Sequence, residues 1–299
     1  MVKRRINLLQ VFVVLMHEMR NQFVSYTYWS IIVWPLLIMA IFERFENFKM
    51  NTISLSTSEI CRLWGNILPI FIFMVCLSYV SIIANSVAMD KTSKLSELLM
   101  VMVDAKEQLV GKILSIYGLL IFQIAVYIGV FNLYGGLTGS RFLNELLSQT
   151  PSQLLVYVVL DAIVAILISL IWTTEIASNI SDEAQVATAV IPVMLIIGTG
   201  TIIAMFFNSP EYFDSGLSAI RVYINVILAF PPIGSLLFPT LLAEGNVTYW
   251  EAFLNLGLEL FIMAFIFRTS VRQYRRGMLS REYSNPFYQA LEKGNTEKK

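Results

Sequence analysis

A chain of 299 residues with 57% hydrophobic and 14% charged residues is too apolar for a soluble domain, where about 25% of residues carry charge. Its mean hydropathy of +0.68 indicates a polytopic membrane protein, and no nucleic-acid partner is expected. The single histidine excludes a histidine-rich metal site, and the two cysteines lack metal or redox spacing. The phosphate-binding motif GxxxxGK[ST] is also missing, so no cofactor is expected in this chain.

The N-terminal segment predicts an amphipathic helix that lies along the membrane surface. Lys3, Arg4 and Arg5 precede an apolar run, Ile6–Met16, which is too short to span a bilayer. The run ends in charged residues without a small-residue cleavage site, so a cleaved signal peptide is not expected. Residues 1–22 are therefore predicted to form a cytoplasmic interfacial helix.

Six apolar runs are long enough to cross a hydrocarbon core of about 30 Å as helices. They are Asn21–Phe42, Leu63–Ala88, Ile113–Leu133, Leu154–Thr173, Ala184–Phe207 and Trp250–Phe267. The predicted fold is therefore an all-α polytopic membrane protein with a six-span transmembrane domain over residues 23–269.

The region before the last span differs from the others because prolines interrupt it. Val222–Phe230 and Ile233–Leu242 are apolar, and Pro231-Pro232 separates them. Nine helical residues reach only about 13.5 Å, less than half the hydrocarbon core. Residues 222–242 are therefore predicted to form a re-entrant hairpin on the outer side. The alternative is a single kinked span, which would place the C-terminus on the other side.

The distribution of positive charge favours the hairpin. With six spans, the N-terminus, the loop at 89–112 and the C-terminus fall on one side and hold 16 of the 21 basic residues. The positive-inside rule then places both termini, with a tail at 270–299, in the cytoplasm. A seventh span would leave eight C-terminal basic residues outside.

The loop at 89–112 combines eight charges with a helical pattern. Four apolar residues follow one another at the spacing of a helix stripe: Leu95, Leu98, Leu99 and Met102. Asp104 and Glu107 then have the spacing of a capping box, which predicts a new helix leading into the next span. Such a segment is either a docking surface or an interfacial helix that anchors the loop among lipid headgroups.

Two acidic residues lie within predicted spans, Asp161 in the fourth and Glu259 in the sixth. Buried charges in spans are costly, so both are candidates for a transport path, as a cation or proton site or as a polar lining. The alternative is a protonated or hydrogen-bonded carboxyl with a structural role. An ion-coupled secondary transporter that uses these two residues is the alternative function, although no inverted repeat is visible. An enzyme is not expected, since the chain has no HExxH and no GxGD motif to pair with Asp161.

Three stretches resemble the membrane subunits of type-2 ABC exporters, in particular the sodium-efflux permeases of the NatB-like group. The first is the Trp-Pro span YWSIIVWPLLIMAIF, and the second is the loop MDKTSKLSELLMVMVDAKEQLVGKIL. The third is AFPPIGSLLFPTLLAEGNVTYWEAFLNLGLEL, followed by the basic segment RTSVRQYRRGMLS. The outer loop Glu43–Arg62 is shorter than in many members, so a sodium ion, a peptide antibiotic and a drug all stay open as substrates.

The resemblance implies a permease in a bacterial plasma membrane that pairs with a second permease chain, alike or different. A separate cytoplasmic ATPase would bind Mg-ATP and dock on a coupling helix in the central loop. The implied docking residues are Lys94, Leu95, Glu97, Leu98, Leu99 and Met102. Glu97 would be the polar contact and the apolar residues the seat, while Pro231, Pro232 and Pro239 would shape an outer gate.

Overall fold

The computed structural model describes residues 7–46, 57–92, 102–138, 150–180, 185–207, 233–243, 245 and 247–279. The described elements are all helices. They are α1 (Leu8–Val24), α2 (Tyr26–Glu46), α3 (Thr57–Thr92), α5 (Ala105–Thr138), α7 (Ser152–Ala177), α8 (Val186–Phe207), α10 (Ile233–Ala243) and α11 (Tyr249–Leu279).

Five of the described helices are long and apolar enough to cross a membrane: α3, α5, α7, α8 and α11. These correspond to the second to sixth predicted spans, so the polytopic membrane class is confirmed. The first predicted span falls on α2, which is not among the five, and a count of six stays a prediction.

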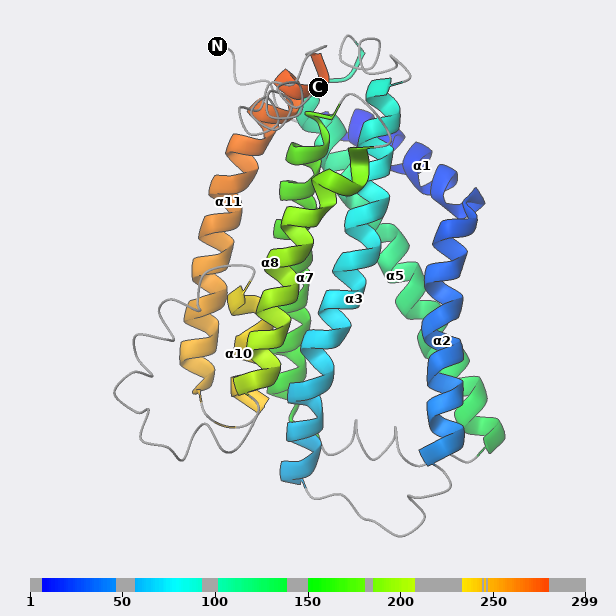
Figure 1. Cartoon of the computed structure of the whole chain (residues 1–299), viewed down its shortest axis with the longest axis vertical. Coiled ribbons are helices and arrows are strands. Elements are labelled where there is room, and N and C mark those ends of the chain that lie inside the picture. The colour runs from blue at the N-terminus through cyan, green and yellow to red at the C-terminus, as the bar shows by residue number, and fades with distance from the viewer. Residues whose placement is uncertain are drawn as a thin grey trace, which may run out of the picture.

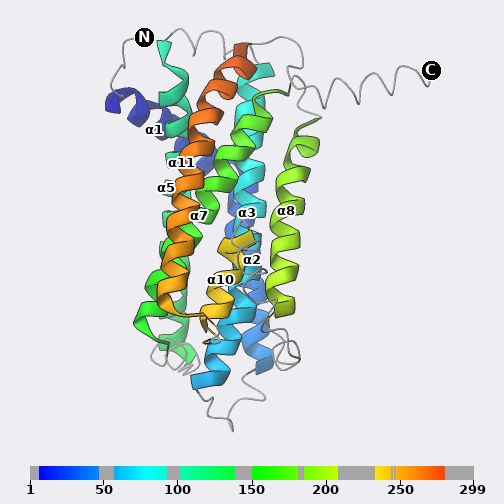
Figure 2. The ribbon, with the colours of Figure 1, turned by 90° about the vertical axis from the view of Figure 1, so that its left-hand side faces the viewer.

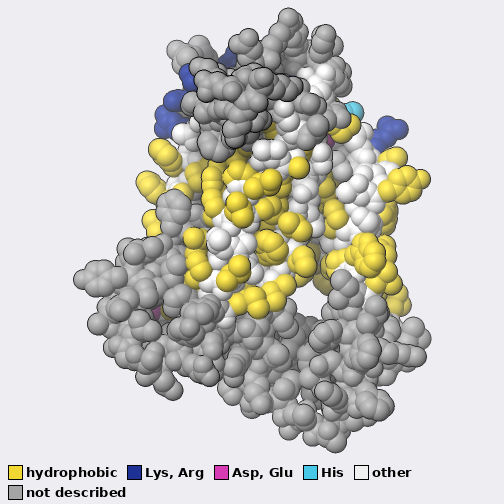
Figure 3. Space-filling model, in the orientation of Figure 1, with side chains coloured by type: hydrophobic (Ala, Val, Ile, Leu, Met, Phe, Trp, Pro, Cys, Tyr) yellow, Lys and Arg dark blue, Asp and Glu magenta, His cyan; other side chains and the backbone are white. Residues whose placement is uncertain are grey.

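The long helices run side by side along the long axis, and α1 is inclined across one end of the bundle (Figures 1 and 2). The C-terminal end of α3, the start of α5 and the C-terminal end of α11 lie at that same end, here called the loop end. Lysine and arginine side chains gather there, above a broad band of hydrophobic side chains (Figure 3). This arrangement agrees with the predicted side for the basic segments, although the cytoplasmic orientation itself stays a prediction.

The last helix is longer than its hydropathy predicted. The apolar run ends at Phe267, but α11 continues to Leu279 because arginine is a good helix former and the last turns pack inside the protein. Ser270, Tyr274 and Gly277 are buried in this extension. The predicted tail at 270–299 therefore starts within a packed helix.

Two kinds of contact hold the helices together. Glycines allow close approach: a Cβ on Gly111 would lie 2.7 Å from the Val14 Cβ of α1, and one on Gly200 would lie 2.8 Å from a Leu236 methyl of α10. Buried polar side chains add specific bonds, such as that from the Tyr28 hydroxyl to the Leu119 carbonyl at 2.9 Å, which joins α2 to α5. These contacts fix α1 and α2 against α5, and α8 against α10.

Helix α1 has the amphipathic character that the sequence predicted. Asn7 caps its start by accepting a hydrogen bond from the Leu9 amide at 3.2 Å. Its apolar side chains at Leu8, Leu9, Phe12, Val13 and Met16 are exposed, while Val11 and Glu18 are buried. A helix that exposes apolar residues at the end of a membrane bundle is suited to the headgroup region.

The short helix α10 corresponds to the second half of the predicted hairpin. Its 11 residues reach about 16.5 Å, and Gly234–Ala243 are all buried among α3, α7, α8 and α11. In Figure 2 it starts near mid-height of the bundle and ends toward the end opposite the loop end. The first half of the hairpin, with Pro231 and Pro232, lies outside the described residues, so the hairpin stays a prediction.

Candidate functional site

The start of α5 confirms the predicted helix restart at the end of the central loop. Asp104 precedes the helix, and its carbonyl accepts a hydrogen bond from the Gln108 amide at 3.1 Å. The Oε1 atom of Glu107 accepts a hydrogen bond from the backbone amide of Asn7 at 3.3 Å. The residue predicted to complete a local cap therefore connects α5 to the start of α1.

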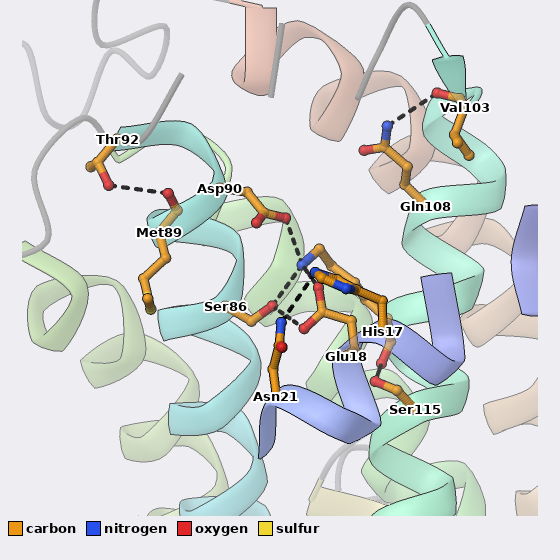
Figure 4. Close-up of polar contacts among 11 residues, drawn as sticks. His17, Glu18, Asn21, Ser86, Met89, Asp90, Thr92, Val103, Gln108 and Ser115 are labelled. Atoms are coloured by element: carbon orange, nitrogen blue, oxygen red, sulfur yellow. Dashed lines mark hydrogen bonds and ion pairs between the residues drawn. The ribbon is translucent and has the colours of Figure 1, made fainter. Parts of the chain in front are cut away.

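Lys112 forms the centre of a buried ionic network at the loop end, and its partners Glu18, Ser86 and Asp90 lie close together in Figure 4. Its ammonium group pairs with Glu18 of α1 and, at 2.8 Å, with Asp90 of α3. It also donates to the Ser86 hydroxyl at 2.6 Å, and Ser86 donates to Glu18 at 2.9 Å. An ammonium group has three donors, and each has an acceptor here. The network thus joins α1, α3 and α5 at one point, referred to below as the Lys112 network.

A second set of contacts joins α3 to α7 and α11 at the same end. Lys91 donates to the Ser178 carbonyl at 2.8 Å, at the C-terminus of α7, where a positive charge is favourable. Gly277 of α11 packs on the same residue, because a Cβ there would lie 2.7 Å from the Ser178 carbonyl oxygen. The Ser270 hydroxyl of α11 donates to Glu175 of α7. The end of α3, which leads into the predicted docking helix, is therefore attached to α7, and α7 is attached to α11.

Most of the predicted docking residues lie outside the described residues, namely Lys94, Leu95, Glu97, Leu98 and Leu99. Met102 is described, and its side chain is 73% exposed. Its backbone carbonyl accepts a hydrogen bond from the side-chain amide of Gln10 in α1 at 3.2 Å. The end of the predicted apolar stripe is thus exposed, and its backbone is held by α1.

Asp161 of α7 and Glu259 of α11, which the sequence analysis treated separately, lie together in the core. Both are fully buried, and their carboxyl groups face one another within interaction range. Tyr157 donates to Asp161 Oδ1 at 3.4 Å, and the Asn255 amide donates to Glu259 Oε1 at 2.9 Å. The Ser235 hydroxyl of α10 lies against Glu259. These five residues are called the carboxyl cluster below.

The carboxyl cluster lies near the middle of the bundle. Asp161 follows Ser152 by nine residues and Glu259 follows Tyr249 by ten, which places each about 14–15 Å along its helix at 1.5 Å per residue. That is about half of a 30 Å hydrocarbon core. Among the described residues, no three His, Cys, Asp or Glu side chains gather as a metal site.

Of the three prolines assigned to an outer gate, only Pro239 is described. It lies inside α10 and is buried. Pro231 and Pro232 fall in the range outside the described residues, so their role stays a prediction.

Comparison with known proteins agrees with this architecture. The profile of the family described as ABC-2 family transporter protein matches residues 38–271. The chain therefore belongs to the ABC-2 transporter family, and it is a multi-pass membrane protein, consistent with a bacterial plasma membrane.

One curated relative is the uncharacterized protein YhaP of Bacillus subtilis (strain 168), which is 25% identical over 225 residues. The match covers 72% of this chain and 51% of that protein, so this chain spans about half the length of the relative. No solved structure matches. The family supports a transport membrane subunit, which agrees with the expectation that the chain is not itself an enzyme.

Proposed function

We propose that this chain is the permease subunit of an ATP-driven ABC exporter and that the coupling helix around Lys94–Val103 docks a separate cytoplasmic ATPase. Membership of the ABC-2 family supports the permease role. The observation that carries the docking proposal is the attachment of the helices on both sides of this segment, by the Lys112 network on one side and by Lys91 on the other.

The attachments explain how a force on the segment would reach the spans. Asp90 of α3 precedes the segment and Lys112 of α5 follows it, and the two form an ion pair. A movement of the docking helix would also reach the end of α7 through the Lys91–Ser178 hydrogen bond, and α1 through the Lys112–Glu18 ion pair. Because these groups are held by short polar bonds, the segment and the ends of four helices would move together rather than independently.

The proposed assembly contains two permease chains, alike or different, in the lipid bilayer, with Mg-ATP bound by the ATPase. ATP-driven closure of two ATPase subunits would displace the docking segment and open a path to the outside, with Pro231, Pro232 and Pro239 at the outer gate. A sodium ion, a peptide antibiotic and a drug remain candidate substrates.

Co-purification tests this proposal. The tagged chain is extracted in a mild detergent, and the eluate is assayed for a second polypeptide with Mg-ATP hydrolysis. We expect an ATPase in the wild-type eluate and its loss in Glu97→Lys. The matched control is Glu46→Lys, the same charge reversal at the last residue of α2, which should retain the ATPase.

Two results would contradict the proposal. Normal ATPase recovery and transport with Glu97→Lys would exclude the role of this residue. A wild-type chain without any ATPase after several mild extractions would favour the ion-coupled secondary transporter, with Asp161 and Glu259 as its ion site.

A further inference from the structure

The carboxyl cluster contains hydrogen-bond acceptors that have no donor. Asp161 Oδ2 and Glu259 Oε2 are buried and have no hydrogen-bond partner among the described residues, and the two carboxyl groups lie within interaction range of each other. The Asn255 Oδ1 atom of the same cluster also lacks a partner in the described part, and the Asn255 side chain is 4% exposed. Unmet acceptors in a dry interior are costly, so the described residues alone leave this cluster without a donor that it needs.

The neighbouring helices do not supply a positive charge. Helices α8 and α10 carry no charged residue in their sequences. The charged residues of α3 are confined to its two ends, and those of α5 to its first turns at the loop end. On α11 the nearest basic residue is Arg268, nine residues beyond Glu259 and about 13.5 Å along the helix. Tyr157 is the one other titratable group that faces the pair among the described residues.

One of the two carboxyl groups has a setting that favours negative charge. The Ser235 hydroxyl of α10 lies against Glu259 and can donate a hydrogen bond to its carboxylate. The Asn255 amide adds a donor at 2.9 Å. Asp161, by contrast, receives one long hydrogen bond from Tyr157 at 3.4 Å.

We propose that Asp161 and Glu259 form a proton-binding site. Asp161 carries the proton, and its O–H group donates a hydrogen bond to the Glu259 carboxylate. Binding converts one carboxylate into a carboxylic acid, which gains an O–H donor, and release to water restores the second carboxylate. One proton thus supplies the missing donor between the two unpartnered oxygens and lowers the charge of the pair from −2 to −1. The bound proton occupies no additional volume in a cluster that is fully buried.

The position of this site gives it a role in transport. A proton held near the middle of the bilayer, between two spans and the short helix α10, would be exchanged when these helices separate. This role rests on the proposed function, whereas the proton itself can be measured on the purified chain without any ATPase.

Infrared difference spectroscopy tests the proton directly. The full chain in lipid nanodiscs should show the C=O stretching band of a buried carboxylic acid, shifted to lower frequency in D2O. The band should be lost in Asp161→Asn. It should be unchanged in Glu251→Gln, since Glu251 is an exposed acid on the same helix, where its carboxylate accepts from the Thr248 amide.

A second variant keeps the test decisive if Asp161→Asn does not fold. Tyr157→Phe removes the hydrogen bond to Asp161 Oδ1, so the band should move to higher frequency without disappearing. A wild-type chain without the band would overturn the proposal. Carboxylate bands that shift when sodium chloride replaces choline chloride would identify a metal-cation site instead. Neither result depends on whether an ATPase co-purifies, so failure here is distinct from failure of the docking proposal.

Discussion

The Lys112 network and the carboxyl cluster are both buried and charged, but their hydrogen bonds differ. Lys112 places its three donors on acceptors from α1 and α3, and the protein itself completes that network. Asp161 and Glu259 place carboxyl oxygens, which are acceptors, near one another, and one oxygen of each has no donor among the described residues. Burial alone therefore does not mark a functional charge: a completed network is a structural joint, whereas an incomplete one is open to a ligand.

The largest effect should come from removing the centre of the completed network. Lys112→Met leaves the buried Glu18 and the partly exposed Asp90 without their cation, and removing one partner of a buried pair costs about 3–5 kcal/mol. The free energy of unfolding in mixed detergent measures the loss. Lys106→Met, six residues earlier on the same helix, lies outside the network and should change stability by less than about 0.5 kcal/mol.

Adding Glu18→Gln to Lys112→Met should restore part of the lost stability, because it removes one of the two uncompensated charges. If the double variant is as unstable as the sum of both single variants, the ionic network is not the source of the effect.

A smaller loss should follow from separating α11 from α7 at the loop end. Gly277→Ala places a Cβ 2.7 Å from the Ser178 carbonyl oxygen, and overpacking of this kind costs about 1–3 kcal/mol. Gly257→Ala on the same helix meets no atom within 4 Å and should be neutral or stabilising by up to about 1 kcal/mol. Equal melting temperatures for the two variants would show that the close approach at Gly277 does not hold these helices together.

The long helices could be predicted from the sequence because a continuous run of apolar residues is enough to predict a membrane span. An apolar run interrupted only by Asp161 predicted a span over Leu154–Thr173, and α7 runs from Ser152 to Ala177. The extension of α11 past Arg268 was not predictable from hydropathy, since it depends on packing against Ser178.

The polar contacts between helices could not be predicted from the sequence and were found only in the structure. Lys112 and Glu18 are 94 positions apart, and both were interpreted as charges outside the spans, because a single sequence holds no signal that pairs them. Asp161 and Glu259 were identified one at a time by the rule that buried charges are costly. Their meeting, and the approach of Ser235 from α10, depend on how three helices pack, which no local pattern encodes.

The smallest effect should come from a neutral replacement in the incomplete cluster. Asp161→Asn exchanges the proposed acid for an amide of the same shape, whose N–H can donate to Glu259 in place of the O–H. Its unfolding free energy should therefore change by about 1 kcal/mol or less. Asp161→Ala offers no donor and leaves the Glu259 carboxylate with its oxygen unmet, which should cost about 1–3 kcal/mol. Equal losses for the two variants would mean that a donor at position 161 is not what Glu259 requires, and the carboxyl cluster would then resemble the Lys112 network in being complete without a ligand.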